Sequence, residues 1–196
     1  MALLGSFVCS GPFSDELVSF LRQEAALEQS TNESVTWLHL SQARDLVHGF
    51  ITLSSASLRI PPRVRKELGL TRPFIPSVMI DYIAVHDAVR DSGLGYALFL
   101  WAQGQAFASN RYAGTRLLVL DVHAGNWGVF QHYCLRWGFV PLPWNVDRYE
   151  DSGQWPTADP ELEAKPAKVP DESYITCVFD LFPVFGAFWP RPGDLD

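Results

Sequence analysis

Several patterns that would point to a membrane or secreted protein are missing from this 196-residue chain. No apolar run reaches the roughly 18 residues that a membrane-spanning helix needs. The opening residues, MALLGSFVCSG, have no basic start and too short an apolar stretch for an export signal. These absences predict a cytoplasmic protein that has no membrane partner.

Cysteine and histidine are scarce, and neither shows the spacing of metal ligands. The three cysteines, Cys9, Cys134 and Cys177, lie far apart without a CxxC pair, and the five histidines form no HxxxH pair. Disulfide frameworks and zinc sites are recognised by an even cysteine count or by closely spaced ligands. The sequence therefore predicts reduced thiols and no metal ion.

Charge is distributed unevenly along the chain. The net charge is −7; residues 1–146 hold 11 acidic and 11 basic side chains, and residues 147–196 hold 11 acidic and 4 basic ones. An acidic, proline-rich loop is predicted at about 147–173, followed by a strand at about 173–182 that returns to the core of a single domain spanning 1–196. The basic run RIPPRVRKELGLTR, residues 59–72, is either a solvated face or a contact for a phosphate-bearing ligand.

The hydrophobic pattern predicts an alternation of helices and strands. Residues 13–29 place apolar side chains at helical spacing, with Ser14 as the candidate N-cap. Further strands are predicted at 35–41, 47–55, 77–86 and 114–124, and further helices at 94–110 and 126–137. The strand at 77–86 is almost continuously apolar, which predicts burial on both faces. A strand, a glycine turn, a helix and a strand in succession predict a βαβ crossover with two parallel central strands.

The stretch VRDSGLGYAL, residues 89–98, places Gly93 and Gly95 between a buried strand and the next helix. Missing side chains expose backbone N–H groups at a helix N-terminus, where the helix dipole favours an anion such as a pyrophosphate. Tight turns also need glycine for steric reasons alone. The stretch is not a P-loop, because no GK[ST] follows, and the third glycine of a dinucleotide-binding fingerprint is absent; no GxSxG nucleophile motif occurs in the chain.

The segment AVHDAVRDSGLGYAL, residues 84–98, resembles motif A of the GNAT superfamily of acetyl-CoA-dependent N-acetyltransferases. Arg90, Gly93 and Gly95 match its pattern [QR]-x-x-G-x-[GA]. The segment VHAGNWGVFQHYCLRWGFVP, residues 122–141, resembles the next strand of the superfamily with its Asn-started helix and Gly-Phe-x-Pro end. The resemblance covers residues 78–141 and implies an α/β (α+β) fold with a mixed, centrally splayed β-sheet flanked by helices.

The N-terminal part resembles a narrower group within that superfamily. FVCSGPFSDELVSFL, residues 7–21, and HGFITLSSASLRIPP, residues 48–62, are similar to the start of the acetyltransferase toxins of bacterial toxin–antitoxin pairs. In those toxins an F-x-C-G-like opening precedes a helix, and a G-[FY]-x-[TS]-L strand precedes motif A.

The resemblance implies which residues hold acetyl-CoA. Backbone groups of Ile83, Ala84 and Val85 would pair with the pantetheine arm, and Arg90 would lie beside the pyrophosphate. Asn126 would face the pantetheine, a role compatible with that of a plain N-cap. The pyrophosphate would be held by the backbone amides of the turn, from Asp91, Ser92, Gly93, Leu94, Gly95 and Tyr96.

The catalytic groups are less well defined by the resemblance. In the superfamily a Tyr of the helix after the second strand commonly protonates the leaving thiolate. Counted forward from Asn126 this position is Tyr133, whereas counted back from Gly138 it is Cys134, and both residues also lie on a helical stripe typical of core packing. Asp81 is the candidate base, because a carboxylate within an apolar strand is costly unless it is paired or functional; its alternative role is a structural hydrogen bond.

Three hypotheses for function follow from the resemblance. The first is an N-acetyltransferase that uses acetyl-CoA and a primary amine of a small molecule or protein. The second is toxin-like acetylation of aminoacyl-tRNA, which the basic run favours and the acidic C-terminal part opposes. The third is a non-catalytic acyl-CoA-binding protein.

Aromatic residues near the C-terminus, namely Phe185, Phe188 and Trp189, belong either to a homodimer contact or to the same core.

Overall fold

The computed structural model describes residues 2–60, 62–67, 69–141 and 174–181. The chain forms two compact units, residues 1–56 with 78–105 and residues 57–77 with 106–196. The acidic segment predicted at 147–173 lies outside the described residues, as do Phe185, Phe188 and Trp189.

The first unit opens with a helical region. Helix α1 (Ala2–Gly5) is followed by α2 (Ser14–Ser19), a π-helical turn (Phe20–Glu24) and α3 (Ala25–Thr31). This confirms the helix predicted at 13–29, but the prediction of Ser14 as its N-cap is wrong. Ser14 is the first helical residue, its N–H donates to Gly11 O at 3.2 Å, and the preceding Phe13 makes no side-chain cap.

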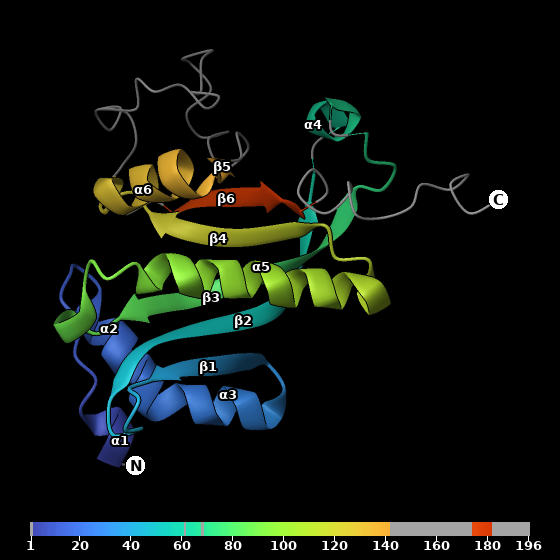
Figure 1. Cartoon of the computed structure of the whole chain (residues 1–196). Coiled ribbons are helices and arrows are strands. Elements are labelled where there is room, and N and C mark those ends of the chain that lie inside the picture. The colour runs from blue at the N-terminus through green and yellow to red at the C-terminus, as the bar shows by residue number, and fades with distance from the viewer. Residues whose placement is uncertain (1, 61, 68, 142–173, 182–196) are drawn as a thin grey trace. The chain divides into compact units, whose positions relative to one another are not determined.

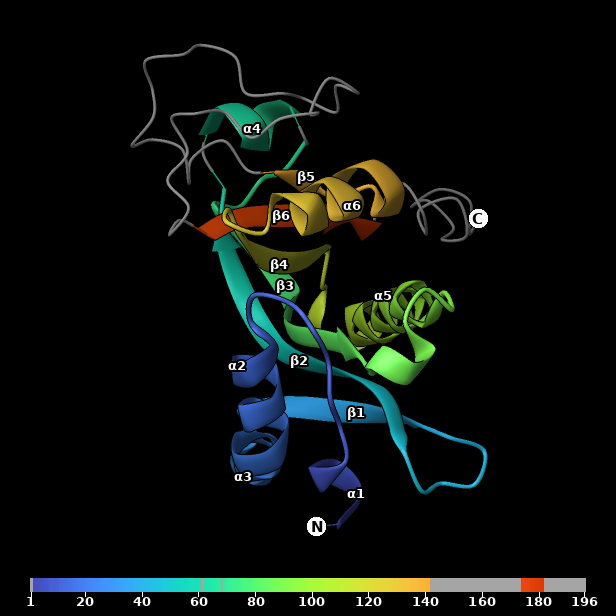
Figure 2. The same cartoon turned by 90° about the vertical axis from the view of Figure 1, so that its left-hand side faces the viewer.

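The next two strands form an antiparallel hairpin, as the pattern predicts. Strand β1 (Ser34–Leu40) pairs with β2 (Val47–Arg59), and Trp37 lies opposite Ile51. The connection is closed by the N–H of Ser41, which donates to Leu46 O at 2.8 Å. In Figure 2, α2 and α3 lie on one side of these strands.

The strand and helix that follow carry the glycine turn between them. Strand β3 (Phe74–Val85) precedes a short 3-10 helix (Asp87–Val89) and α5 (Leu94–Ala113). The prediction that residues 77–86 are buried on both faces is wrong at Asp81, which is exposed. Figure 2 shows α5 on the side of β2 and β3 opposite to α2 and α3.

The core of the first unit is built around stacked aromatic side chains. Phe20 stacks on Tyr82, with ring centroids 3.9 Å apart, and Phe7 meets Phe50 edge-on at 5.4 Å. Buried rings at such distances gain from both apolar burial and ring geometry.

On the same unit, Gly49 lets strand and helix approach closely, because an added Cβ would lie 2.9 Å from Ala84 O and 3.2 Å from side-chain atoms of Leu94 and Leu98.

The second unit contains the remaining elements: α4 (Pro62–Glu67), β4 (Leu117–His123), α6 (Trp127–Trp137), β5 (Val140–Pro141) and β6 (Tyr174–Asp180). Strands β4 and β6 pair antiparallel along their whole length, with Leu120 opposite Cys177 (Figure 1). Arg116 and Asp180 form an ion pair of 2.9 Å at one end of this pair. The returning strand predicted at about 173–182 is confirmed over Tyr174–Asp180.

The six strands of the described residues belong to one sheet in the order β1-β2-β3-β4-β6-β5. The N–H of Arg116, just before β4, donates to Pro76 O near the start of β3 at 3.0 Å, as expected for strands that begin at the same edge. The result is a mixed α+β fold with a six-stranded sheet and flanking helices, as the resemblance implied. Within the described ranges, no helix has the length and apolarity to cross a membrane, and no cluster of side chains is suited to a metal ion.

Candidate functional site

The turn before α5 presents backbone N–H groups, as its glycines predict. Asp91 and Gly93 adopt left-handed backbone angles, with φ values of 59° and 84°. The first helical hydrogen bond runs from Ala97 N to Gly93 O at 3.1 Å. Among the described residues, the amides of Asp91, Gly93 and Gly95 have no acceptor. They lie at the positive end of a 20-residue helix, an arrangement suited to an anion.

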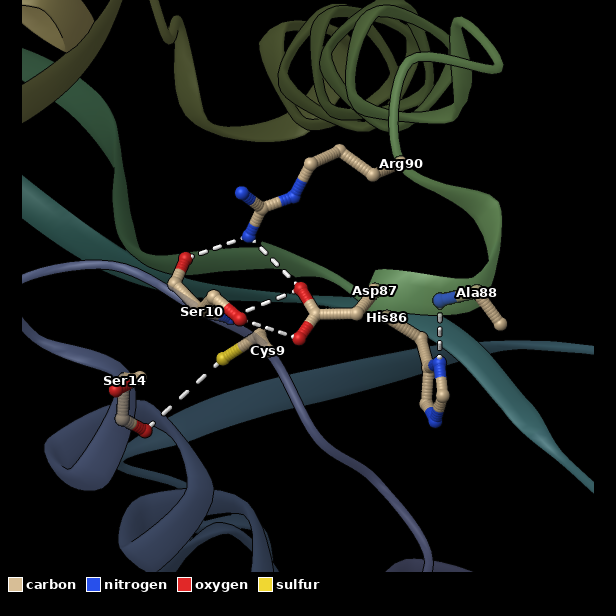
Figure 3. A network of polar contacts seen from close by, with 7 residues as sticks. All are labelled: Cys9, Ser10, Ser14, His86, Asp87, Ala88 and Arg90. Atoms are coloured by element: carbon tan, nitrogen blue, oxygen red, sulfur yellow. Dashed lines mark hydrogen bonds and ion pairs between the residues drawn. The ribbon is translucent and has the colours of Figure 1, made fainter.

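The side chain of Arg90 is hydrogen-bonded to Ser10 of the N-terminal segment and to Asp87. Its Nη2 donates to Ser10 O at 2.6 Å and to Asp87 Oδ1 at 2.8 Å (Figure 3). The same carboxylate accepts hydrogen bonds from the backbone N and the hydroxyl of Ser10. The guanidinium is therefore held between the N-terminal segment and the 3-10 helix, because Ser10 supplies a carbonyl acceptor and Asp87 a carboxylate.

The end of β3 keeps the residues implied for the pantetheine next to the turn. Ala84 is buried, and Ile83 and Val85 are partly buried. Strand β3 ends at Val85, and the N–H of the next residue, His86, donates to His48 O of β2 at 2.7 Å. Ile83, Ala84 and Val85 thus occupy the last three positions of the strand before the 3-10 helix.

Asp81 does not lie in the buried setting that made it a candidate base. Its side chain is exposed, and Oδ1 accepts a hydrogen bond from Ser54 Oγ at 2.9 Å. The cost of burying a carboxylate therefore does not arise at this position. The structure gives Asp81 the hydrogen bond that was its alternative role, with Ser54 of strand β2 as the donor.

Tyr133 and Cys134 lie on the middle of α6 in the second unit. Phe130 and Trp137 of their stripe are buried, whereas Tyr133 and Cys134 are partly buried. Burial of the phenol, together with the nearby Cys177, raises the pKa of Tyr133 to about 12. The tyrosine therefore stays protonated at neutral pH and is able to donate its proton.

Cys134 has a second thiol as its neighbour. A hydrogen bond with Cys134, together with burial, raises the pKa of Cys177, which is fully buried on β6. All three cysteines are free thiols, as the sequence predicts. The α6 helix thus places a phenol and a thiol at successive positions, and both remain proton-donor candidates.

Asn126 occupies the N-cap position of α6 without using its side chain as a cap. Its backbone oxygen accepts from Val129 N at 3.0 Å and from Phe130 N at 3.2 Å, and its side chain makes no capping hydrogen bond. The amide side chain is therefore not committed to the helix terminus, which is compatible with the ligand role implied by the resemblance.

The sequence analysis did not predict the hydrogen bonds of one group of residues and left the exposure of a second group open. Ser10 and Asp87 are 77 positions apart, so no local pattern signals their hydrogen bonds. The basic run is the second group, since Arg59, Lys66 and Arg72 are exposed and Arg65 is partly buried. These side chains place positive charge on the second unit.

The fold is GNAT-like, a mixed sheet with a glycine turn leading into the helix that follows strand β3. Among solved structures, AtaT complexed with acetyl-methionyl-tRNAfMet is similar over 95% of this chain and 92% of that chain, with a TM-score of 0.67 and 16% identity. A tyrosine variant of KacT is similar over 94% and 91%, with a TM-score of 0.66 and 16% identity.

AtaTR bound with acetyl-CoA is similar over 95% of this chain and 90% of that chain, with a TM-score of 0.63 and 16% identity. At these identities the likeness establishes the fold. No family model and no curated protein matches the sequence.

Proposed function

We propose that this protein is an acetyl-CoA-dependent N-acetyltransferase. The observation that carries the proposal is the glycine turn at the start of α5, where the amides of Asp91, Gly93 and Gly95 have no acceptor among the described residues. A pyrophosphate supplies oxygens for such donors, and the helix dipole stabilises its charge. The solved AtaT structures that hold acetyl-CoA have the same fold over nearly the whole chain.

The remaining cofactor contacts are proposed from the resemblance. Backbone groups of Ile83, Ala84 and Val85 pair with the pantetheine arm, and Asn126 supplies a side-chain amide to it. Of the turn amides, from Asp91 to Tyr96, those of Asp91, Gly93 and Gly95 are proposed to bind the phosphates, because the N–H of Ser92 donates to Val89 O at 3.3 Å and that of Leu94 to Ser92 Oγ at 3.4 Å. The thioester of acetyl-CoA supplies the activated acetyl group, and the chain's own residues orient it and manage the protons.

Transfer to an amine requires two proton movements. The amine must be neutral to attack the thioester carbon, and the departing thiolate must be protonated. Asp81, an exposed carboxylate, is proposed to accept the proton of the amine directly or through water. Tyr133 is proposed as the donor to the thiolate, since its raised pKa of about 12 keeps the phenol protonated; Cys134 is the other candidate.

For the acceptor we propose the amino group of an aminoacyl-tRNA. AtaT, whose complex contains acetyl-methionyl-tRNAfMet, has the same fold over 95% of this chain. The exposed side chains of Arg59, Lys66 and Arg72, with the partly buried Arg65, provide positive charge for a phosphate backbone. Small-molecule and protein amines are the competing acceptors, and the experiment below separates the three.

The test is acetyl transfer from labelled acetyl-CoA to total aminoacyl-tRNA, with deacylated tRNA, polyamines and a lysine-containing peptide as alternatives. We expect label in aminoacyl-tRNA and none in deacylated tRNA, because only the aminoacylated form carries the basic α-amino group of an amino acid. Label in polyamine or peptide at comparable kcat/KM would replace the tRNA proposal with that acceptor. Absence of transfer to every acceptor, together with intact acetyl-CoA binding, would favour a non-catalytic binding protein.

A matched salt series sharpens the tRNA proposal. Neutralising Lys66 and Arg72 together should weaken tRNA binding and reduce the slope of log K against log salt by about 1 to 2, since each lost phosphate contact removes about 0.7 to 0.9. Neutralising Arg44, which is exposed on the β1–β2 turn of the first unit, is the control and should leave the slope unchanged.

A further inference from the structure

The N-terminal segment, residues 6–10, is fastened to the residues that lead from β3 into the glycine turn. The N–H of Asp87 donates to Val8 O at 3.1 Å. His86 Nδ1 accepts from Ala88 N at 3.0 Å, so Nε2 carries the proton and faces Ser6 O at 3.3 Å. Alternate residues of the segment thus contact the loop, as in an added strand.

Ser10 and Arg90 complete this attachment (Figure 3). Ser10 donates to the Asp87 carboxylate with its backbone N–H at 2.9 Å and also with its hydroxyl. Arg90 Nη2 bridges Ser10 O and Asp87 Oδ1. The hydrogen bonds from Ser10 and the charge of Arg90 lower the pKa of Asp87, which therefore stays ionised at neutral pH.

The attachment involves both ends of the 3-10 helix that precedes the turn. Asp87 begins this helix and Arg90 follows its last residue, Val89. The next residue, Asp91, is the first left-handed position of the turn. Because the turn amides must point together to bind an anion, restricting the backbone immediately before them reduces the entropy lost on binding.

We propose that Arg90 is a positioning residue for the acetyl-CoA site, acting through Ser10 and Asp87 to hold the N-terminal segment against the loop, while backbone amides bind the phosphates. This inference rests on the proposed cofactor binding. It assigns to the N-terminal segment a part in ordering the turn, and it differs from a direct contact between the guanidinium and the pyrophosphate.

The two roles of Arg90 predict opposite effects of Asp87→Asn. If Arg90 contacted the phosphates, removing the neighbouring carboxylate would leave the guanidinium more available and reduce repulsion of the anion, so affinity would rise. If Arg90 is a positioning residue, the same change weakens the hydrogen bonds to Ser10 and to Arg90, and affinity falls. Asp91→Asn removes a carboxylate within the turn without touching this network and reports the purely electrostatic effect, which is a gain in affinity.

The experiment is calorimetric titration of acetyl-CoA into the full chain at several salt concentrations. The variants are Arg90→Met, Arg90→Lys, Asp87→Asn, the double variant of Arg90→Met with Asp87→Asn, and Asp91→Asn as the electrostatic comparator. Hydrogen exchange of residues 6–10 is measured on each variant, and thermal unfolding verifies that each one is folded. The double variant makes a cycle that isolates the coupling between the two side chains.

We expect Arg90→Met and Asp87→Asn each to weaken acetyl-CoA binding by about 1.5- to 5-fold, the range of a partly exposed charged pair. The double variant should bind no more weakly than the weaker single variant, and the salt dependence should stay that of the wild type. Arg90→Lys should recover part of the loss. Exchange of the Ser10 amide should increase wherever affinity falls.

Tighter binding by Asp87→Asn, or additive losses in the double variant with a reduced salt dependence for Arg90→Met, would overturn the positioning role. Either result leaves the proposed function intact, since the wild type binds in both. If the folded wild type does not bind acetyl-CoA at millimolar concentration, the proposed function fails and this inference fails with it.

Discussion

The two units differ in the kind of group that each would contribute to acetyl transfer. In the first unit the proposed binding groups are backbone amides around Asp91, Gly93 and Gly95, whose direction depends on backbone angles. In the second unit the proposed proton donors, Tyr133 and Cys134, are side chains on a regular helix. Backbone recognition depends on glycine and on loop geometry, whereas side-chain chemistry depends on which residue type stands at one helical position.

The largest expected effect is in the second unit. Tyr133→Phe removes the proposed proton donor and keeps the ring that packs on Trp137 at 4.7 Å. We expect kcat to fall by about 10² to 10⁴, the usual range for a lost general acid, with little change in KM for acetyl-CoA. Steady-state kinetics of this variant and of Cys134→Ala decides between the two, because the donor is the residue whose loss lowers kcat.

The pH dependence of kcat provides a separate measurement of the donor. The protonated phenol is present below its pKa and is lost as pH rises through about 12. A Tyr133 donor therefore predicts no falling limb between pH 7 and 10. A falling limb in that interval that disappears in Cys134→Ala would assign the donor role to the thiol instead.

The next largest effect is expected in the first unit, on binding. Gly93→Asp places a Cβ at a residue with φ of 84° and adds negative charge beside the turn amides. Left-handed strain of about 1 to 2 kcal/mol and the added repulsion should weaken acetyl-CoA binding by roughly 100-fold. Calorimetry measures the loss. The control is Gly104→Asp, at an exposed position within helix α5, which follows the turn; this variant should bind acetyl-CoA with unchanged affinity.

A smaller effect, on stability, is expected where β2 approaches α5. In Gly49→Ala the new methyl group would lie 2.9 Å from Ala84 O and 3.2 Å from Leu94 and Leu98, so strand or helix must move. Overpacking of this kind costs about 1 to 3 kcal/mol in the free energy of unfolding. Denaturant unfolding measures the cost, and an unchanged midpoint would mean that the helix shifts without strain.

The smallest effect concerns a left-handed residue remote from the turn. Asn32 ends α3 with φ of 59°, where the following N–H, of Glu33, donates to Glu28 O at 2.9 Å. Asn32→Gly should leave acetyl-CoA affinity unchanged and alter unfolding by less than about 1 kcal/mol, because glycine adopts this conformation without strain. Thermal unfolding measures the change in stability, and calorimetry measures acetyl-CoA affinity. A changed affinity would mean that a left-handed residue affects binding even when it lies outside the turn that contains Gly93.

The features that could be predicted from the sequence are those written in local patterns. The helix at 13–29, the β1–β2 hairpin and the crossover through α5 follow from hydrophobic spacing. Gly93 and its turn follow from glycine placed between a strand and a helix. A left-handed conformation at that position is what the residue type itself favours.

The features that could not be predicted depend on residues distant in sequence. Arg90 fits a family pattern, yet its guanidinium donates a hydrogen bond to the backbone oxygen of Ser10, 80 positions earlier. No residue near Arg90 in the sequence predicts that acceptor. Asp81 was expected to be buried because its neighbours in sequence are apolar, but exposure of a strand position is decided by what covers the sheet there. The side chains that determine the local chemistry therefore needed the tertiary structure.

The π-helical turn at Phe20–Glu24 bears on how this chain should be aligned with others. A π turn holds one residue more than an α turn of the same reach, so a single extra residue is accommodated between α2 and α3. It allows the consecutive residues Phe20 and Leu21 and the later Ala25 all to be buried. When this chain is aligned with a relative whose helix is uninterrupted, the alignment must contain a one-residue gap at this turn, opposite an exposed residue such as Gln23. Without that gap, every residue of α3 would be aligned one position away from its structural equivalent.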